Sequence, residues 1–130
     1  MPDFRFATID ELGEGPGFHK VRGPLGIDAF GANVLVMAPH FDGFEHYHDI
    51  QDELYFVHSG TARIEVGGET RDLGQGGLFH CQSTLPRKIS NPGDVELVML
   101  IVGAKNGYVE RDGHLVDPER DGERRANFGK

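Results

Sequence analysis

The sequence has one cysteine, no tryptophan and no long apolar run. With Cys81 alone, the 130-residue chain cannot form an internal disulfide, so nothing indicates an oxidising compartment. No window approaches 18 consecutive apolar residues, which excludes a transmembrane helix, and residues 1–10 lack the basic and apolar regions of a secretory signal. We therefore expect a cytoplasmic protein.

Basic residues are also scarce. The chain has 13 Lys and Arg against 21 Asp and Glu, a formal net charge of −8. This balance opposes the phosphate neutralisation on which nucleic-acid binding depends, and it disfavours anionic membranes as well. The imbalance is greatest over residues 23–62, which contain acidic side chains but no Lys or Arg, so this stretch should attract cations.

Glycine is abundant, at 19 of 130 residues, roughly double the usual share of about 7%. The glycines separate short apolar runs, and this pattern predicts an all-β sandwich or barrel with little helix. The length fits one domain over residues 1–130. The runs expected to form strands are 33–37, 54–57, 62–66, 77–81 and 96–102.

Turns and chain ends complete this outline. Gly67-Gly68 joins two alternating segments in the clearest predicted hairpin, and residues 91–94 predict a second sharp turn. We expect a core over about residues 18–109, with a flexible N-terminal arm or an edge strand over residues 10–24. Residues 110–130 are highly charged and predict a solvated tail or a short terminal helix over residues 118–128.

Two histidines and a glutamate carry the chemistry. His46 and His48 are two residues apart, so on a strand their imidazoles share one face. Glu53 begins the following strand and can supply a carboxylate from beside them. Two imidazoles and one carboxylate on one wall of a pocket are the facial ligand set of divalent Fe, Mn, Ni or Zn.

The spacing resembles the first motif of the cupin superfamily, G-x5-H-x-H-x(3,4)-E-x6-G. His46, His48, Glu53 and Gly60 are in register with it, and the leading glycine is not matched. The resemblance covers about residues 34–102. It implies a double-stranded β-helix, or jelly-roll barrel, often found as a homodimer.

The second cupin motif, G-x5-P-x-G-x2-H-x3-N, matches less well. Gly76 and Asn91 are in register, but Arg87 stands where the family has its last metal-binding histidine. A guanidinium has no lone pair to offer a metal. Either the metal stays on the other ligands and Arg87 anchors an anionic substrate group, or Arg87 pairs with Glu53, the metal is lost and the pocket binds an organic anion.

Further side chains are candidates for the same pocket. His80, on the expected strand over 77–81, is a possible additional metal ligand if its register turns it inward. Tyr55 shares the face of Glu53 by the two-residue period and is predicted to position substrate. His40, Asp49 and Gln51 are weaker candidates near the mouth of the barrel.

The resemblance implies a small cupin metalloprotein that acts on a small organic molecule, as an oxygenase, isomerase, cyclase or lyase. In this hypothesis His46, His48, Glu53 and His80 hold the metal, while Arg87 and Tyr55 contact an anionic substrate. The alternative is a metal-free cupin that binds or senses a small organic anion without catalysis. A structural dimer component with an inert pocket is a third possibility.

Overall fold

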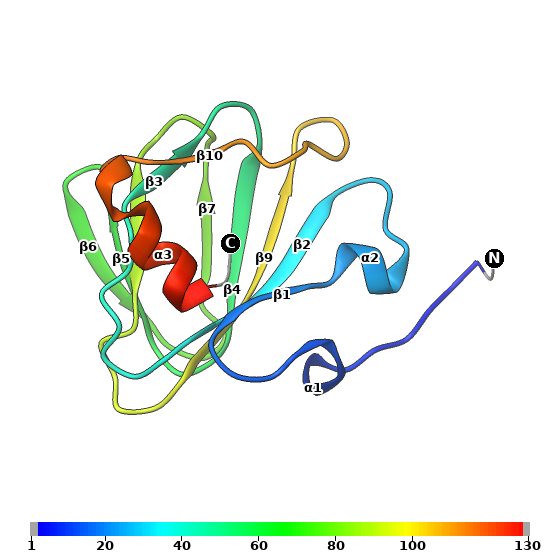
Figure 1. Ribbon diagram of the computed structural model, residues 1–130, viewed down its shortest axis with the longest axis horizontal. Coiled ribbons are helices and arrows are strands. Elements are labelled where there is room, and N and C mark those ends of the chain that lie inside the picture. Colours follow the sequence, from blue (N-terminus) through cyan, green and yellow to red (C-terminus); the bar gives the residue numbers. More distant parts are fainter. Residues whose placement is uncertain (1–2, 129–130) are drawn as a thin grey trace.

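The computed structural model describes residues 3–128, with side chains described to residue 124, and contains two five-stranded antiparallel sheets packed face to face (Figure 1). Sheet A has the order β1 (Gly17–Lys20), β2 (Gly31–Met37), β9 (Leu97–Ala104), β4 (Asp52–Ser59) and β7 (Leu78–Cys81). Sheet B has the order β10 (Gly113–Leu115), β3 (His46–His48), β8 (Arg87–Ser90), β5 (Ala62–Val66) and β6 (Glu69–Leu73). The helices are α1 (Ile9–Leu12), α2 (Arg22–Leu25), η1 (Pro118–Arg120) and α3 (Asp121–Phe128). The predicted jelly-roll barrel is confirmed.

The core lies between the sheets and is centred on β9. This strand pairs with β2 on one side and β4 on the other, and its side chains alternate between buried and half-buried. A central strand with apolar neighbours on both faces requires a continuous apolar run, which residues 97–102 provide. The buried residues of this core are Leu35, Met37, Tyr55, Val57, Ala62, Ile64, Cys81, Ile89, Leu97, Met99 and Ile101.

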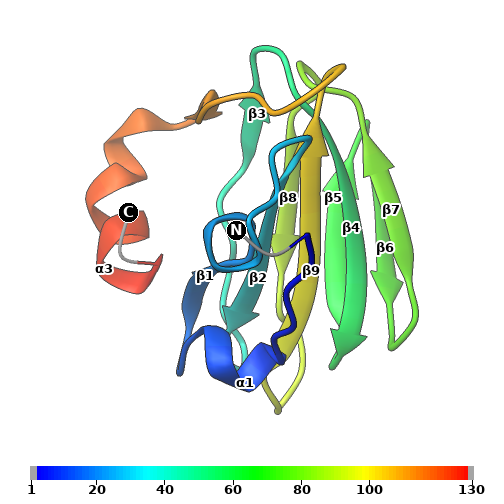
Figure 2. The ribbon, with the colours of Figure 1, turned by 90° about the vertical axis from the view of Figure 1, so that its right-hand side faces the viewer.

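A second apolar cluster lies on the outer face of sheet A. Val34 and Val36 point outward from β2, and Ile9 and Leu12 of α1 pack against the cluster together with Leu25. Figure 2 shows the blue N-terminal segment and α1 passing in front of β2 and β9. The short helices therefore cover apolar surface that the strand alternation leaves outside. Of the two alternatives for residues 10–24, the edge strand is present, as β1.

Both predicted turns are confirmed. Gly67 and Gly68 have φ of 57° and 77°, the left-handed conformations that a two-residue hairpin loop between β5 and β6 requires. At the second turn, the buried Asn91 side chain donates from Nδ2 to the carbonyls of Met37, Ala38 and Val95. These bonds join the turn to the end of β2.

The C-terminal region is more ordered than the sequence predicts. The helix expected over residues 118–128 is present as η1 and α3, but β10 adds a strand to sheet B by pairing with β3. Ordered structure therefore continues beyond residue 109, the predicted end of the core, although the buried apolar clusters of the described residues contain no residue after Val102. Figure 2 shows α3 beside the edge of the barrel where β1 and β3 lie. Among the described residues no helix is long and apolar enough to cross a membrane.

We expect Gly43→Ala to destabilise the fold by about 2–3 kcal/mol, since a methyl group there would coincide with the backbone carbonyl of Ile89. The Gly43 N–H also donates to Ser90 Oγ at 2.9 Å. Gly74→Ala is the control, because Gly74 has open space around it and an ordinary φ. Urea unfolding should show almost no change for Gly74→Ala, and equal loss in both variants would contradict this packing.

Candidate metal centre

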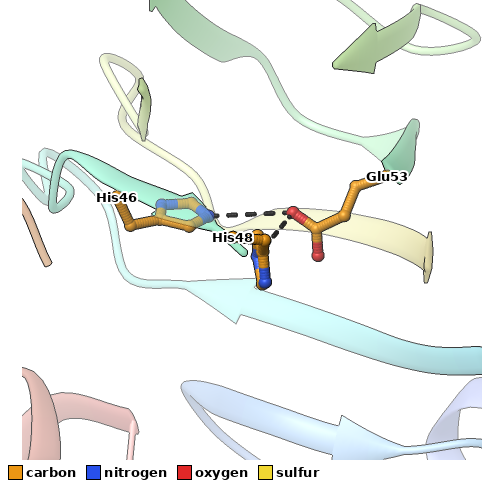
Figure 3. Close-up of side chains that lie close together, drawn as sticks. All are labelled: His46, His48 and Glu53. Carbon is orange, nitrogen blue, oxygen red and sulfur yellow. Dashed lines mark ion pairs between the residues drawn. The ribbon is translucent and has the colours of Figure 1, made fainter. Parts of the chain in front are cut away.

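The two sheets bring His46, His48 and Glu53 together at one end of the barrel interior. β3 supplies both histidines and β4 supplies the glutamate, whose carboxylate points toward both rings (Figure 3). Glu53 Oε1 lies 3.0 Å from His48 Nε2 and 3.8 Å from His46 Nε2. One ligand atom from each of the three residues lies within 4.8 Å of the others. The predicted three-residue cluster is therefore present.

Hydrogen bonds orient both imidazoles toward Glu53. His46 Nδ1 lies 3.3 Å from the Phe44 carbonyl oxygen, and His48 Nδ1 lies 2.8 Å from Asp112 Oδ1. A carbonyl and a carboxylate only accept, so Nδ1 of each ring is placed to carry a proton. Without a cation, Nε2 of His48 donates to Glu53 Oε1, and loss of that proton would free an Nε2 lone pair for a metal. Three converging acceptors fit a bound cation, and a histidine held through Nδ1 is the usual metal ligand.

The carboxyl group of Glu53 is held ionised. Burial alone would raise the pKa of Glu53, but the interactions with His46, His48 and Tyr55 outweigh it and hold the pKa well below its usual range. For His48, burial lowers the pKa, and the contacts with Glu53 and Asp112 more than offset this and raise it. An ionised carboxylate is the form that binds a divalent cation.

Arg87 is fully buried behind Glu53. Its Nη2 donates to Glu53 Oε1 at 2.6 Å, and its Nε donates to the Tyr55 hydroxyl at 3.2 Å. Its Nη1 donates to the carbonyls of Ser83 and Leu85 at 2.9 and 3.0 Å. The guanidinium has 0% exposure, so the predicted contact between Arg87 and a substrate is wrong. Arg87 instead fixes the glutamate.

The pairing with Arg87 leaves part of the glutamate available. Arg87, Tyr55 and His48 all contact Oε1, and no hydrogen bond reaches Oε2 from the described residues. Oε1 is the oxygen that faces both imidazoles, and it also forms the ion pair with Arg87. A carboxylate has acceptor capacity for several partners, so the two alternatives posed by the sequence, an ion pair with Arg87 and a metal on Glu53, do not exclude each other.

Tyr55 belongs to the same buried network. Its hydroxyl donates to Glu53 Oε1 at 2.5 Å and accepts from Arg87, and its side chain is only 2% exposed. Burial is the main reason that its pKa is raised, which keeps the hydroxyl protonated as a donor. Tyr55 lines the pocket, but its hydroxyl is already bonded to protein groups. A direct role on substrate stays a prediction.

His80 does not join the cluster. On β7 it is exposed and in register with the exposed Leu54, whereas Cys81 and Phe79 turn inward beside Glu53 and Tyr55. The two-residue period therefore places His80 on the outer face of sheet A, and its predicted role as a ligand is wrong. His40 is likewise exposed and pairs with Asp94 at 2.6 Å.

Asp112 is the site residue that the sequence did not reveal. Besides His48, its carboxylate accepts from the backbone N–H groups of Ile50 and Gln51 at 2.7 and 3.0 Å, and from Gln51 Nε2 at 2.6 Å. These bonds outweigh burial and lower its pKa to about 2. Asp112 lies just before β10, in the highly charged stretch that the sequence predicts to be a solvated tail. Only the pairing of β10 with β3 brings it to the site.

A pocket of about 1000 Å³ leads from the cluster to the surface, on the side where β1, β3 and α3 meet. Its inner end contains His46, His48 and Glu53, and Leu35 and Ile101 form part of an apolar wall. Polar and basic residues line the outer part. The arrangement provides room for a small molecule beside the three candidate ligands.

An antiparallel barrel with two histidines and a glutamate in its interior defines a class of small β-barrel proteins with a candidate metal site. The Cupin domain family model matches residues 33–103, more than half of the 130 residues. The chain therefore belongs to the cupin family. No curated protein is significantly similar to it in sequence.

Solved structures show the same fold at low identity. An uncharacterised double-stranded β-helix protein from Klebsiella pneumoniae has 18% identity and a TM-score of 0.72, with 87% of this chain and 97% of that chain covered. A sugar phosphate isomerase of the cupin superfamily from Silicibacter pomeroyi has 18% identity, 78% and 76% coverage and a TM-score of 0.67. A DMSP lyase from Ruegeria pomeroyi has 24% identity, 90% and 62% coverage and a TM-score of 0.67.

We expect Arg87→Met to destabilise the protein by about 3–5 kcal/mol, because it leaves the carboxylate of Glu53 buried without its main charge partner. Arg71→Met is the control, since it removes an ion pair with Glu69, 2.9 Å long and between exposed side chains, and should cost less than about 1 kcal/mol. Chemical unfolding of both variants measures the difference. Similar losses would show that Arg87 is not the structural partner of Glu53.

We expect Asp112→Asn to weaken divalent-metal binding about 10–100-fold, because it removes the charge that orients His48. Asp49→Asn is the control: it removes a carboxylate from the neighbouring loop between β3 and β4, where the Asp49 side chain pairs with the exposed His114. Competition with a chromophoric chelator measures both affinities. Unchanged affinity in Asp112→Asn, with normal stability, would refute the orienting role.

Proposed function

We propose that this cupin is a metal-dependent enzyme acting on a small organic anion, with a divalent Fe, Mn, Ni or Zn ion held by His46, His48 and Glu53. The observation that carries the proposal is the orientation of the two imidazoles. Their Nδ1 atoms are bonded to Phe44 and Asp112, which directs both Nε2 atoms toward the ionised carboxylate.

When bound, the ion would supply a Lewis acid that stabilises negative charge developing on a carbonyl or carboxylate oxygen of the substrate. The chain's own groups prepare this position. Arg87 and Tyr55 fix the Glu53 carboxylate, and Asp112 fixes the His48 ring. The apolar wall of Leu35 and Ile101 limits water beside the reacting centre, which strengthens the electrostatic interactions there.

The charge of the pocket supports an anionic substrate. Its lining includes four Lys and Arg residues and only two carboxylates, although the whole protein has a net charge of −8. A basic cleft in an acidic protein concentrates small anions. The basic lining residues are Lys20, Arg22, Arg111 and Arg124, and the acidic ones are Glu53 and Asp121.

The reaction is proposed only as one of the oxygenase, isomerase, cyclase or lyase types. The similar structures include one described as a sugar phosphate isomerase and one described as a DMSP lyase, and at 18% and 24% identity their likeness concerns the fold. A fold shared by several chemistries does not select among them. A cytoplasmic location and a homodimeric assembly stay predictions from the sequence.

A metal-free cupin that binds or senses a small anion is the second candidate. The buried ion pair between Arg87 and Glu53 favours it, because the carboxylate already has a cationic partner without any metal. Under this alternative Glu53→Gln mainly destabilises the fold by leaving Arg87 unpaired. Under the metal proposal Glu53→Gln also abolishes metal binding.

We expect the apoprotein to bind one Co²⁺ per chain, observed by d–d absorption, because Co²⁺ is a spectroscopic substitute for the proposed metals. His46→Ala and His48→Ala should each weaken binding at least about 100-fold, since each removes one of three ligands. His80→Ala, on the outer face, is the control and should bind normally. Absence of specific Co²⁺ binding to the wild-type chain would refute the metal proposal and favour the second candidate.

A further inference from the structure

Two basic residues at the pocket lack a carboxylate partner. Lys20 and Arg22 line the pocket, and neither forms an ion pair with any described residue. Most other described Lys and Arg residues do form one, which is expected where acids outnumber bases. The paired residues are Arg63, Arg71, Arg87, Lys88, Lys105, Arg120 and Arg124.

The strand register places Lys20 on the interior face of sheet A. Lys20 of β1 pairs with Asn33 of β2, and Asn33 pairs with Ile101 of β9. Ile101 is in turn the partner of Tyr55 on β4. The four residues form one row across the sheet, and all four line the pocket. Lys20 therefore faces the same cavity as the candidate metal ligands.

Asn33 is a polar exception on its strand. The other interior side chains of β2, Leu35 and Met37, are apolar and buried, and the Asn33 side chain has no hydrogen-bond partner among the described residues. Its amide therefore offers a donor and an acceptor to whatever occupies the pocket. An amide beside a lysine on one row of the sheet suits an anionic oxygen group.

Arg22 is held in position without an ion pair to any described residue. Its guanidinium carbon lies 3.7 Å from the centre of the Tyr108 ring, and Nη1 donates to the Ile27 carbonyl at 3.3 Å. Both contacts orient the planar group at the pocket mouth and leave further N–H donors available. Orientation in advance lowers the entropy lost when an anion binds.

Lys20 and Glu53 are on different strands of sheet A. Three strand-to-strand spacings separate β1 from β4 in the order β1-β2-β9-β4. At about 4.8 Å each, they span roughly 14 Å of sheet. This separation of the two backbones favours a ligand that has one polar group for each of them.

We propose that Lys20, Arg22 and Asn33 form a subsite for a carboxylate or phosphate at the far end of a ligand whose near end lies at His46, His48 and Glu53. The inference rests on the proposed function and deepens it, since it defines the substrate class as small molecules with anionic groups at two ends. In this proposal Lys20 and Arg22, which line the pocket, hold the anionic group of the substrate that the sequence analysis assigned to the buried Arg87.

The test compares dicarboxylates with monocarboxylates of equal chain length on the Co²⁺-loaded protein. Succinate, glutarate, adipate and pimelate are matched with butyrate, pentanoate, hexanoate and heptanoate, and 4-phosphonobutyrate tests phosphate-like recognition. Calorimetry measures affinity at low ionic strength, and the Co²⁺ spectrum reports contact with the metal end. We expect at least one two-ended ligand to bind about tenfold more tightly than its matched monocarboxylate.

Variants then locate the second contact. Lys20→Met combined with Arg22→Met should reduce the tenfold preference of two-ended ligands over matched monocarboxylates to about twofold or less. Lys20→Arg should retain the preference, because it keeps the charge. Lys105→Met is the control, since it removes a positive charge that pairs with Asp52 on the surface. Thermal melting of each variant checks that the fold is intact.

Two kinds of failure are distinguishable. If monocarboxylates alter the Co²⁺ spectrum but no two-ended ligand gains affinity, or the gain survives in the double variant, the subsite is refuted and the proposed function stands. If Co²⁺ does not bind, the proposed function fails and the two-ended substrate class fails with it. A gain only for 4-phosphonobutyrate supports the subsite and identifies phosphate as its preferred group.

Discussion

The buried carboxylate of Glu53 is the charge around which the rest of this barrel is organised. A carboxylate in a protein interior is strongly destabilising unless cations and hydrogen-bond donors compensate it. Here Arg87 and the Tyr55 hydroxyl contact one oxygen, together with His48, and the second oxygen remains available. Arg87 is in turn satisfied by backbone carbonyls of the loop before β8. Protein groups thus compensate the charge at Oε1, and Oε2 has no hydrogen-bond donor among the described residues.

The sheet architecture explains how distant residues reach this charge. Glu53 and Tyr55 are on sheet A, whereas Arg87 and the histidines are on sheet B, so packing of the two sheets assembles the cluster. The C-terminal strand β10 then adds Asp112, which orients His48 and caps the loop between β3 and β4. Stability of the barrel and geometry of the site therefore depend on the same contacts.

Features that depend only on residues close together in the sequence could be predicted, and features that depend on the pairing of distant strands could not. The positions of His46, His48 and Glu53 follow from a fixed spacing on two strands that are consecutive in the sequence, and the Gly67-Gly68 turn follows from its residues alone. His80 was misplaced because one residue of register reverses a side chain, and local sequence does not determine the register of β7. Asp112 and Lys20 reach the pocket only through strand pairing at the two ends of the chain. The full burial of Arg87 likewise depends on the loop that covers it.

The central claim is that His46, His48 and Glu53 bind a metal ion while the ion pair between Glu53 and Arg87 is kept. A crystal structure of the protein soaked with Zn²⁺ or Co²⁺, with anomalous data collected at the metal edge, tests it most directly. The account predicts one ion about 2.0–2.2 Å from the Nε2 atoms of His46 and His48 and from a Glu53 oxygen, with the Arg87 ion pair intact. An anomalous map with no peak between these side chains, and His48 still bonded to Glu53, would contradict it.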